Sequence, residues 1–466
     1  MAKKARSVWR RCMALGLSAV LALSLTACGN SDTGDDANDG KLNNGIDDTV
    51  VDLGGYEFTV GTPFMQDKMD ANNVMASEAI FDEIRQKVEK DYNCKITVVP
   101  VTNDVERVRT KVIAGEKIAD IIEVEGFDLL PMARAGYILP LESVKGLDIT
   151  DKRYIQSYMN CTEFNGSHYG ITWMRPPQLR SLIVYNRDLL KKLGIAEDPQ
   201  ELAKSGQWTF DKFREMCKTA TNAASGVYGC FLTLPDTFGV NLISANGGSL
   251  VKSENGVATE NFNTPQAITA LNFMNDLINT DKSTVHCYTR GIGSEDNKVN
   301  AANFVAGKYL FYYCEGWQLT KNIRPVAENV DYGIVPLPKG PDATGYVTPS
   351  ENAGHYCITS TNKDLDKTVI VLNALAKYTL EYSEGDWWQY ETEMDFFHKG
   401  DTASVEMYYE MIDHATLDMG VGVPDLWSAF KEDVITAAIL KNQGTPASKI
   451  DAITGKYKSA IDAAYN

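Results

Sequence analysis

Along residues 51–125 the spacing of hydrophobic residues changes repeatedly between the period of a strand and the period of a helix. Short runs rich in β-branched and aromatic residues alternate with stretches in which hydrophobic residues recur every three or four positions. This βαβαβ order predicts a largely parallel sheet covered by helices. The predicted strands are Tyr56–Val60, Lys95–Val99 and Ala119–Val124, and the predicted helices carry Phe81, Ile84 and Val88, then Val105, Val108 and Val112.

Two patterns after residue 160 extend this prediction. Asn165-Gly166 separates Glu163-Phe164 from His168-Tyr169 and has the composition of a type I′ hairpin turn. Ser181–Tyr185 has the composition of a strand that begins a second α/β unit. Because residues 51–466 are too many for one hydrophobic core, we expect two domains.

The N-terminus has the pattern of a secretory signal, since five basic residues precede a mostly apolar run from Cys12 to Ala27. The run ends Leu25-Thr26-Ala27-Cys28, which resembles the bacterial lipobox, whose cysteine is acylated and becomes the first residue. An uncleaved anchor is the alternative, but the run is short against the roughly 20 residues that cross a bilayer. We therefore expect residues 1–27 to be removed, Cys28 to carry lipid, and residues 28–50, rich in polar residues and glycine, to form a flexible tether.

Charge and cysteine usage narrow the possible partners. Loss of residues 1–27 removes five positive charges and changes the formal net charge from -17 to -22, which disfavours nucleic acid as a partner. Besides Cys12 and Cys28, seven of the nine cysteines remain; none pair at CxxC spacing, and we expect small buried hydrophobic residues rather than disulfides. The five histidines are scattered, so we expect no metal site and no cofactor.

Seven short segments follow one another along the chain, and their order is more specific than any single segment. In this order they resemble family 1 of the extracellular solute-binding proteins, which includes the maltose-type receptors of ABC importers. The resemblance spans nearly all of residues 51–466. The segments are Ala114–Ile122, Ala135–Leu141, Tyr185–Leu190, Trp208–Phe210, Phe304–Lys308, Glu315–Trp317 and Tyr332–Pro338.

The resemblance implies an α/β fold with two lobes, of the type II periplasmic-binding-protein kind, and a ligand cleft between the lobes. Crossing strands join the lobes, which close on a solute. We expect lobe 1 to hold residues 51–180 and about 356–415, and lobe 2 to hold residues 181–355 and about 416–466. Several residues of the segments also have structural roles: Gly115, Gly136 and Gly307 as helix ends, Thr209 as a helix cap, and Asn186 and Asp188 as partners of turn backbone.

A sugar presents apolar C–H faces that stack on aromatic rings and hydroxyl groups that need polar partners once water is excluded. The resemblance suggests Trp317 as a stacking residue, against a core role, and Glu315 beside it as a hydroxyl acceptor. Trp173 and Arg180 flank the first crossing between lobes, where Arg180 is equally explained as a structural ion-pair partner. The remaining candidates are Glu125 and Phe127 after the third strand, Phe64 after the first, Asp236 and Phe238, Trp427, and one of Trp387 and Trp388.

One departure from the family leaves the register near Trp427 open, because maltose-type relatives carry their aromatic residue about a turn later, where this chain has Lys431.

The expected function is capture of a carbohydrate, most simply an oligosaccharide, by a monomer that is lipid-anchored at the extracellular face and serves an ABC permease. Peptides, polyols and other polar metabolites are the alternative solutes, and a receptor that reports to a sensor would share the fold. An anchored polysaccharide hydrolase would need two carboxylates across a groove, and the sequence contains no Gly-x-Ser-x-Gly, HExxH or phosphate-loop motif.

Overall fold

The computed structural model describes residues 48–63, 76–101, 105–173, 179–254, 257–350, 354–383 and 395–465, without the side chains of 76–79, 105–106 and 127. The signal, Cys28 and most of the tether lie outside these residues, as do Phe64, Trp387 and Trp388. Residues 44–466 form one compact unit. Within the described ranges, no helix has both the length and the apolar character needed to cross a membrane.

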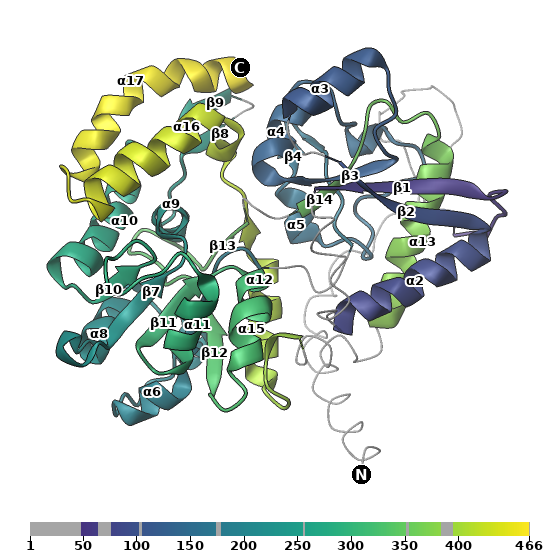
Figure 1. The fold of residues 1–466 in the computed structure, drawn as a ribbon. Helices are drawn as coiled ribbons and strands as arrows, with labels where there is room; N and C mark the ends of the chain where they lie inside the picture. The colour runs from purple at the N-terminus through teal and green to yellow at the C-terminus, as the bar shows by residue number, and fades with distance from the viewer. Residues whose placement is uncertain are drawn as a thin grey trace, which may run out of the picture. The chain divides into compact units, whose positions relative to one another are not determined.

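A four-stranded sheet, the first sheet, is built from the N-terminal part of the chain and one later strand (Figure 1). β1 pairs in parallel with β2 and with β3, and β14 is antiparallel to β3, which confirms the predicted parallel sheet. Its strands, in spatial order, are β14 (Gly354–Ile358), β3 (Ile121–Glu125), β1 (Tyr56–Thr62) and β2 (Cys94–Pro100).

Helices pack on both faces of the first sheet. On one face, Phe58 and Ile121 of the sheet form a core with Ile84 and Val88 of α2 and with Leu372 of α13. On the other face, residues of α4 join a second core that continues to the second sheet. The helices of this part are α2 (Ala76–Tyr92), α3 (Val105–Ala114), α4 (Gly126–Arg134), α5 (Gln156–Asn160) and α13 (Leu365–Ser383).

The second sheet has five strands and is more deeply buried than the first. β7 pairs in parallel with β10 and with β11, whereas β6 is antiparallel to β11 and to β12. Every residue of β6, β11 and β12 is buried, as expected for strands covered on both faces. In spatial order the strands are β10 (Thr284–His286), β7 (Tyr228–Leu232), β11 (Tyr309–Cys314), β6 (Leu182–Asn186) and β12 (Tyr332–Val335).

Short strand pairs and many helices complete this part of the chain (Figure 1). The pairs are β4 (Glu163–Phe164) with β5 (Ser167–His168), β8 (Val251–Glu254) with β9 (Val257–Glu260), and β13 (Thr348–Pro349) with β15 (Ala415–Thr416). The helices are α6 (Arg187–Lys192), α7 (Pro199–Lys204), α8 (Phe210–Ala220), α9 (Pro235–Ala245), α10 (Pro265–Asn275), α11 (Asn297–Val305), α12 (Gly316–Gln318), α15 (Thr402–Asp413), α16 (Pro424–Ala429), the π-helical η7 (Phe430–Leu440) and α17 (Pro446–Tyr465).

The local turn and cap predictions are confirmed. Asn165 and Gly166 both have positive φ, as a type I′ turn between β4 and β5 requires. Thr209 accepts a hydrogen bond from the backbone of Lys212 and caps α8. Asn186 caps α6 in the same way, and the three predicted helix-ending glycines also have positive φ.

A partly buried ion pair fixes residues 395–413 to the second sheet. Arg187, which follows β6, lies 2.9 Å from Asp401 at the start of α15. Tyr332 of β12 donates a hydrogen bond of 2.6 Å to the backbone oxygen of Phe396. In these contacts, Phe396 and Asp401 meet residues of the second sheet. The predicted boundary that assigns about 356–415 to lobe 1 stays a prediction.

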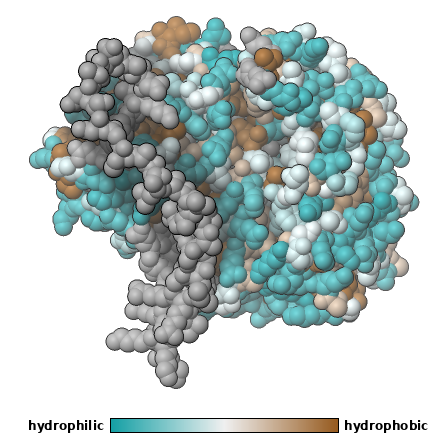
Figure 2. Space-filling view, turned by 180° about the vertical axis from the view of Figure 1, so that it is seen from behind, coloured by the Kyte–Doolittle hydropathy of each residue, from teal (hydrophilic) through white to brown (hydrophobic). Residues whose placement is uncertain are grey.

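All seven cysteines of the described residues are buried and free, as the sequence predicts. Burial raises the pKa of Cys94 and of Cys287 to about 11, so both remain thiols at neutral pH. On the face seen in Figure 2, hydrophobic residues appear as scattered patches in a mainly hydrophilic surface.

Asp120 lies just before β3, and its fully buried side chain connects this strand to β1. Its carboxylate accepts hydrogen bonds from the hydroxyl of Tyr56 (2.6 Å) and from the backbone and hydroxyl of Thr59 (2.7 Å each). Lys117 pairs with it at 2.8 Å. Burial alone would raise the pKa of Asp120, but these hydrogen bonds outweigh burial and lower it.

Replacing Asp120 by alanine should lower the free energy of unfolding by about 3 kcal/mol or more, because several buried donors lose their acceptor together. Chemical denaturation measures the change. Since the folded-state pKa is lowered, this stabilisation is present above the ordinary pKa of 3.8 and is lost as pH falls through the folded-state value. Asp364→Ala is the control, because this 44% exposed side chain lies 4.0 Å from the same Lys117 and should change stability by less than about 0.5 kcal/mol. Equal losses in the two variants would contradict the assignment.

Candidate ligand-binding site

The carboxyl ends of the parallel strands define one edge of each sheet, which is where open α/β sheets bind ligands. In the first sheet this edge holds Thr62 at the end of β1 and Glu125 at the end of β3. In the second sheet it holds the residues that follow β7, β10 and β11, and the start of antiparallel β6, because Leu182 pairs with Cys314. These two edges are therefore the first places to look for a site.

Glu315, Trp317 and Arg180 form a compact group at the edge of the second sheet. Glu315 caps the short helix α12 through a reciprocal pair of hydrogen bonds with Gln318. The indole Nε1 of Trp317 donates to Glu315 Oε2, which holds the half-buried ring beside the carboxylate. Arg180 Nη1 lies 3.7 Å from the same oxygen, and its Nε has no hydrogen-bond partner among the described residues. The group thus combines an aromatic ring, a carboxylate and a guanidinium whose Nε is buried without a partner among the described residues.

Two carboxylates lie on one face of β3 in the first sheet. Glu123 and Glu125 are two residues apart, so their side chains point to the same side. Thr62 Oγ1 donates a hydrogen bond of 2.6 Å to Glu123 Oε2. Gly354 of β14 lies opposite Glu125, and a Cβ at this glycine would come within 2.8 Å of Glu123 Oε1. A larger residue there would displace the Glu123 carboxylate.

Electrostatic interactions connect the edges of the two sheets. Burial raises the pKa of Glu125 to about 7, whereas the positive charge of Arg180 acts to lower this pKa. The carboxylates of Glu315, Asp128 and Glu123 raise this pKa further. Arg180 and Glu315 at the edge of the second sheet therefore act electrostatically on Glu125 at the edge of the first. Both sheets therefore contribute to one acidic cluster around Arg180.

His355 of β14 lies fully buried behind this cluster. Its Nδ1 is 3.1 Å from the hydroxyl of Thr172, and its Nε2 has no partner within the described part of the chain. Burial, followed by the charge of Arg180, lowers the pKa of His355 to about 3. The imidazole is therefore neutral at physiological pH and adds no positive charge to the site.

Asp236 and Trp427 lie together, although they are far apart in the sequence. Lys431 Nζ is 2.7 Å from Asp236 Oδ2 and 5.5 Å from the centre of the Trp427 ring. Asp236 follows β7, the strand next to β11, so this group lies at the same edge as Glu315.

A family model described as bacterial extracellular solute-binding protein matches residues 73–376, more than half of the chain. The chain belongs to this family. A comparison with curated proteins gives no significant match to this solute-binding protein. The predicted family and the predicted two-lobed α/β fold are both confirmed.

Solved structures that resemble this solute-binding protein share its fold at low sequence identity. The galacto-N-biose-/lacto-N-biose I-binding protein of the ABC transporter from Bifidobacterium longum, in complex with lacto-N-biose, has a TM-score of 0.62 and 16% identity, covering 89% of this chain and 98% of that one. The GacH receptor of Streptomyces glaucescens has a TM-score of 0.59 and 17% identity, with coverage of 87% and 98%. UgpB from Mycobacterium tuberculosis, in complex with glycerophosphocholine, has a TM-score of 0.62 and 17% identity, with coverage of 88% and 99%.

The other candidate residues of the solute-binding protein either pack in hydrophobic cores or have no described side chain. Trp173 is 5% exposed and packs on Tyr356 with ring centres 4.8 Å apart, in the core of the first sheet. Phe238 is fully buried and packs on Tyr313. Phe127 is in the first turn of α4, but its side chain is not described, and Phe64 lies outside the described residues. Contact of these residues with a solute stays a prediction.

Three residues that accompany the predicted ones were not predicted from the sequence as site residues. Glu123 has a signal in the sequence, because it alternates with Glu125 along a strand. Tyr288, which is 60% exposed, follows β10 at the same edge as Asp236. Lys431 is visible in the sequence only as a departure from the family, and its partner Asp236 is far away along the chain.

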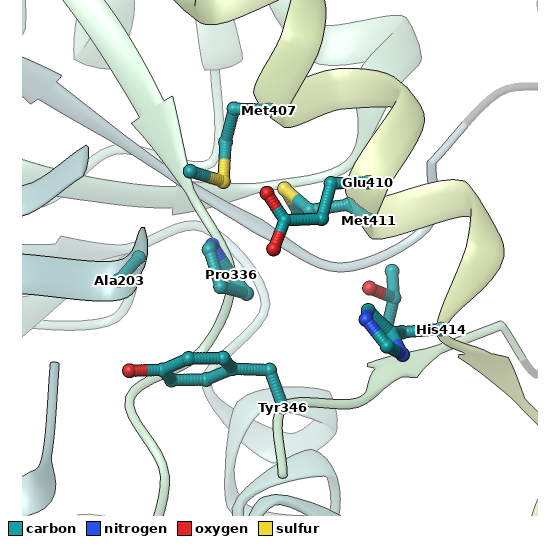
Figure 3. A pocket seen from close by; sticks show the side chains of 8 residues that line it. Ala203, Pro336, Tyr346, Met407, Glu410, Met411 and His414 are labelled. Atoms are coloured by element: carbon teal, nitrogen blue, oxygen red, sulfur yellow. The ribbon is translucent and has the colours of Figure 1, made fainter. Parts of the chain in front are cut away.

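The described residues also outline two hollows elsewhere. One lies between α15 and β13, where Met407, Glu410 and His414 face Pro336 and Tyr346 (Figure 3). Its volume of about 10 Å³ suits no more than one water molecule. The other, of about 280 Å³, is an open groove between η7 and α17. Among the described residues, no group of three or more His, Cys, Asp or Glu side chains is placed to hold a metal ion.

Proposed function

We propose that this solute-binding protein captures a carbohydrate, most simply an oligosaccharide, and delivers it to the permease of an ABC importer. The group of Trp317, Glu315 and Arg180 carries the proposal. The Trp317 ring offers an apolar face for C–H groups, while the carboxylate accepts from hydroxyl groups and the guanidinium donates to them. Glu125 adds a polar group from the other sheet. Together they provide both kinds of contact that a sugar ring requires.

The charge of the cluster favours a neutral solute over an anionic one. Arg180 lies 3.7 Å from Glu315, and the carboxylates of Glu315, Asp128 and Glu123 act together on Glu125. An added negative charge would meet repulsion at short range from most of these groups. Solved structures of similar fold include complexes with lacto-N-biose, acarbose and maltotetraose, and one with glycerophosphocholine. The charge of the cluster and these complexes favour a sugar as the solute. Another polar metabolite stays the alternative.

The raised pKa of Glu125 predicts that solute affinity increases as pH falls through about 7. A bound solute excludes water from the carboxyl and raises its pKa further, so the complex holds more protons than the free protein. Calorimetric titration from about pH 8 to about pH 6 measures the effect. Glu125→Gln, which keeps the shape but does not titrate, should lose most of the dependence. Affinity that falls over this interval would contradict the role of Glu125.

The Glu125 carboxyl group also makes the stability of the folded protein depend on pH. Because the pKa of Glu125 is raised in the folded state, its contribution to stability is fully present below the ordinary value of 4.5. It is lost as pH rises through about 7, where the folded protein must ionise a buried carboxyl. Comparing unfolding of the free protein with unfolding of the complex separates this effect from the change in affinity.

The proposal is binding without turnover. Calorimetry with oligosaccharides measures affinity, and mass spectrometry of the recovered solute tests turnover. Recovery of the intact oligosaccharide after prolonged incubation is the expected result. Cleaved fragments would instead support the anchored hydrolase and would direct attention to the carboxylate pair of Glu125 and Glu315.

The proposed location is the extracellular face of the cell membrane, with lipid on Cys28 and residues 28–50 as a tether. The composition of the N-terminal segment supports this, since basic residues, an apolar run and a lipobox-like ending follow one another. Metabolic labelling with a fatty acid tests it: the wild-type protein should take up label and Cys28→Ala should not. Closure of the two lobes on the solute is part of the proposal and is tested by small-angle scattering with and without sugar.

A further inference from the structure

Gln318, the last residue of α12, is almost fully buried, with 1% of its surface exposed. Its side-chain Oε1 accepts a hydrogen bond of 3.0 Å from the backbone N–H of Glu315. The hydroxyl of Thr233 lies 3.1 Å from the same oxygen. One side chain thus connects the residue that follows β7 to the residue whose carboxylate holds the Trp317 indole.

Thr233 is itself held by the neighbouring strand. Its backbone N–H and its hydroxyl lie 3.3 Å and 2.9 Å from the backbone oxygen of Tyr313 in β11. Thr233 is only 5% exposed, so water has little access to these hydrogen bonds. The side chain of Gln318 is therefore fixed at the ends of two paired strands, β7 and β11.

Gly316 connects the same short helix to the segment before β6. Its N–H donates a hydrogen bond of 2.7 Å to the backbone oxygen of Leu179, which directly precedes Arg180. A Cβ at Gly316 would lie 2.9 Å from this oxygen, so a larger residue would push the two segments apart. The backbone that carries Trp317 is thus connected to the backbone that carries Arg180.

These hydrogen bonds matter because α12 is only three residues long. Isolated helices shorter than about 12 residues are marginal in water, so α12 depends on its contacts with the rest of the protein for its position. The ends of β7 and β11 and the segment before β6 supply these contacts.

We propose that Gln318 is a positioning residue for the Trp317 ring. It fixes the backbone of Glu315, whose carboxylate accepts from the indole, so the ring is held in one orientation before a sugar arrives. The inference rests on the proposed function, in which this ring stacks on a sugar. A ring that is already oriented loses less conformational freedom on binding. Gln318 therefore increases affinity from a buried position, through Trp317.

The alternative is that Gln318 only stabilises the fold. Gln318→Met leaves two buried donors without their acceptor, so it should lower the unfolding temperature under either interpretation. Affinity separates the two. Thr379→Val is the matched control, because this fully buried hydroxyl donates a hydrogen bond of 2.8 Å within α13, against the first sheet. It should lower stability and leave affinity unchanged.

The first test is calorimetry of the complete chain with the saccharide that gives the largest thermal shift in a panel that includes lacto-N-biose and maltotetraose. Gln318→Met should weaken binding roughly 10-fold, as the loss of a residue that orients a metal ligand often does. Thr233→Val should weaken it roughly 3-fold, whereas Thr233→Ser, which keeps the hydroxyl, should bind as the wild type does. In the Trp317→Ala background, Gln318→Met should cause no further loss.

The second test needs no solute. The fluorescence of Trp317 is obtained as the difference between a protein and the same protein with Trp317→Phe. In Gln318→Met this emission should shift to longer wavelength, because a ring that is held less firmly meets more water. Thr379→Val should leave the emission unchanged.

Wild-type affinity in Gln318→Met, an unshifted Trp317 emission, or a full loss of affinity that persists in the Trp317→Ala background would each overturn the positioning role. The proposed function would then still stand. A wild-type protein that binds no saccharide would overturn the proposed function instead, and the emission would still decide whether Gln318 orients the ring.

Discussion

Replacing Trp317 by alanine should weaken solute binding by roughly 30- to 1000-fold while the protein stays folded. A central aromatic anchor typically contributes about 2 to 4 kcal/mol to binding. The Trp317 ring is half-buried and held by its hydrogen bond to Glu315, so the variant loses a stacking face and also releases that carboxylate. Calorimetry measures the affinity, and thermal unfolding without solute verifies the fold.

Two variants make this result specific. Trp317→Phe keeps an aromatic face but loses the N–H that donates to Glu315, so it should fall between the wild type and Trp317→Ala. Trp208→Phe changes a fully buried tryptophan that donates to the backbone of Pro336, and it should lower stability with little effect on affinity. Normal affinity in Trp317→Ala would remove this residue from the site.

Replacing Arg180 by methionine should weaken binding at least 30-fold or so and should also destabilise the protein. The loss of one partner from a poorly solvated charge pair typically costs about 2 to 5 kcal/mol, because the remaining charge has no counterpart. Arg180 is 16% exposed and Glu315 6%, and Arg180 also lowers the pKa of Glu125. Its removal therefore leaves Glu315 without its nearby cation and takes away the positive charge that acts on Glu125.

Lowering the pH should rescue part of the stability of Arg180→Met. Without the guanidinium, the pKa of Glu125 rises further above about 7, and protonation removes the repulsion from Glu315. Arg180→Lys keeps the charge but not the planar fork, so it should recover stability more than affinity. A stability loss that is independent of pH would show that Arg180 acts through packing alone.

Much of the fold could be predicted from the sequence because its signals are local. The strand and helix periods around Phe58, Ile84 and Ile121 reflect faces that pack in one core. The Asn165-Gly166 turn depends only on the backbone freedom of two adjacent residues. The segment order then identified the family that the family model also matches.

The site was less predictable because its geometry depends on contacts between distant residues. The sequence indicates that Glu125, Arg180 and Glu315 follow or precede strands, but not that they share one electrostatic cluster. It likewise does not pair Asp236 with Lys431. Phe238 packs on Tyr313 in the core of the second sheet, and its contact with a solute stays a prediction.

We expect residues 30–466 to bind a carbohydrate through Trp317. A thermal-shift screen of this segment against sugars, polyols, peptides and amino acids tests it most directly, since a ligand that binds only the folded form raises the unfolding temperature in a dose-dependent way. We expect the largest shift with an oligosaccharide and its loss in Trp317→Ala. Shifts confined to peptides or charged metabolites would contradict the claim.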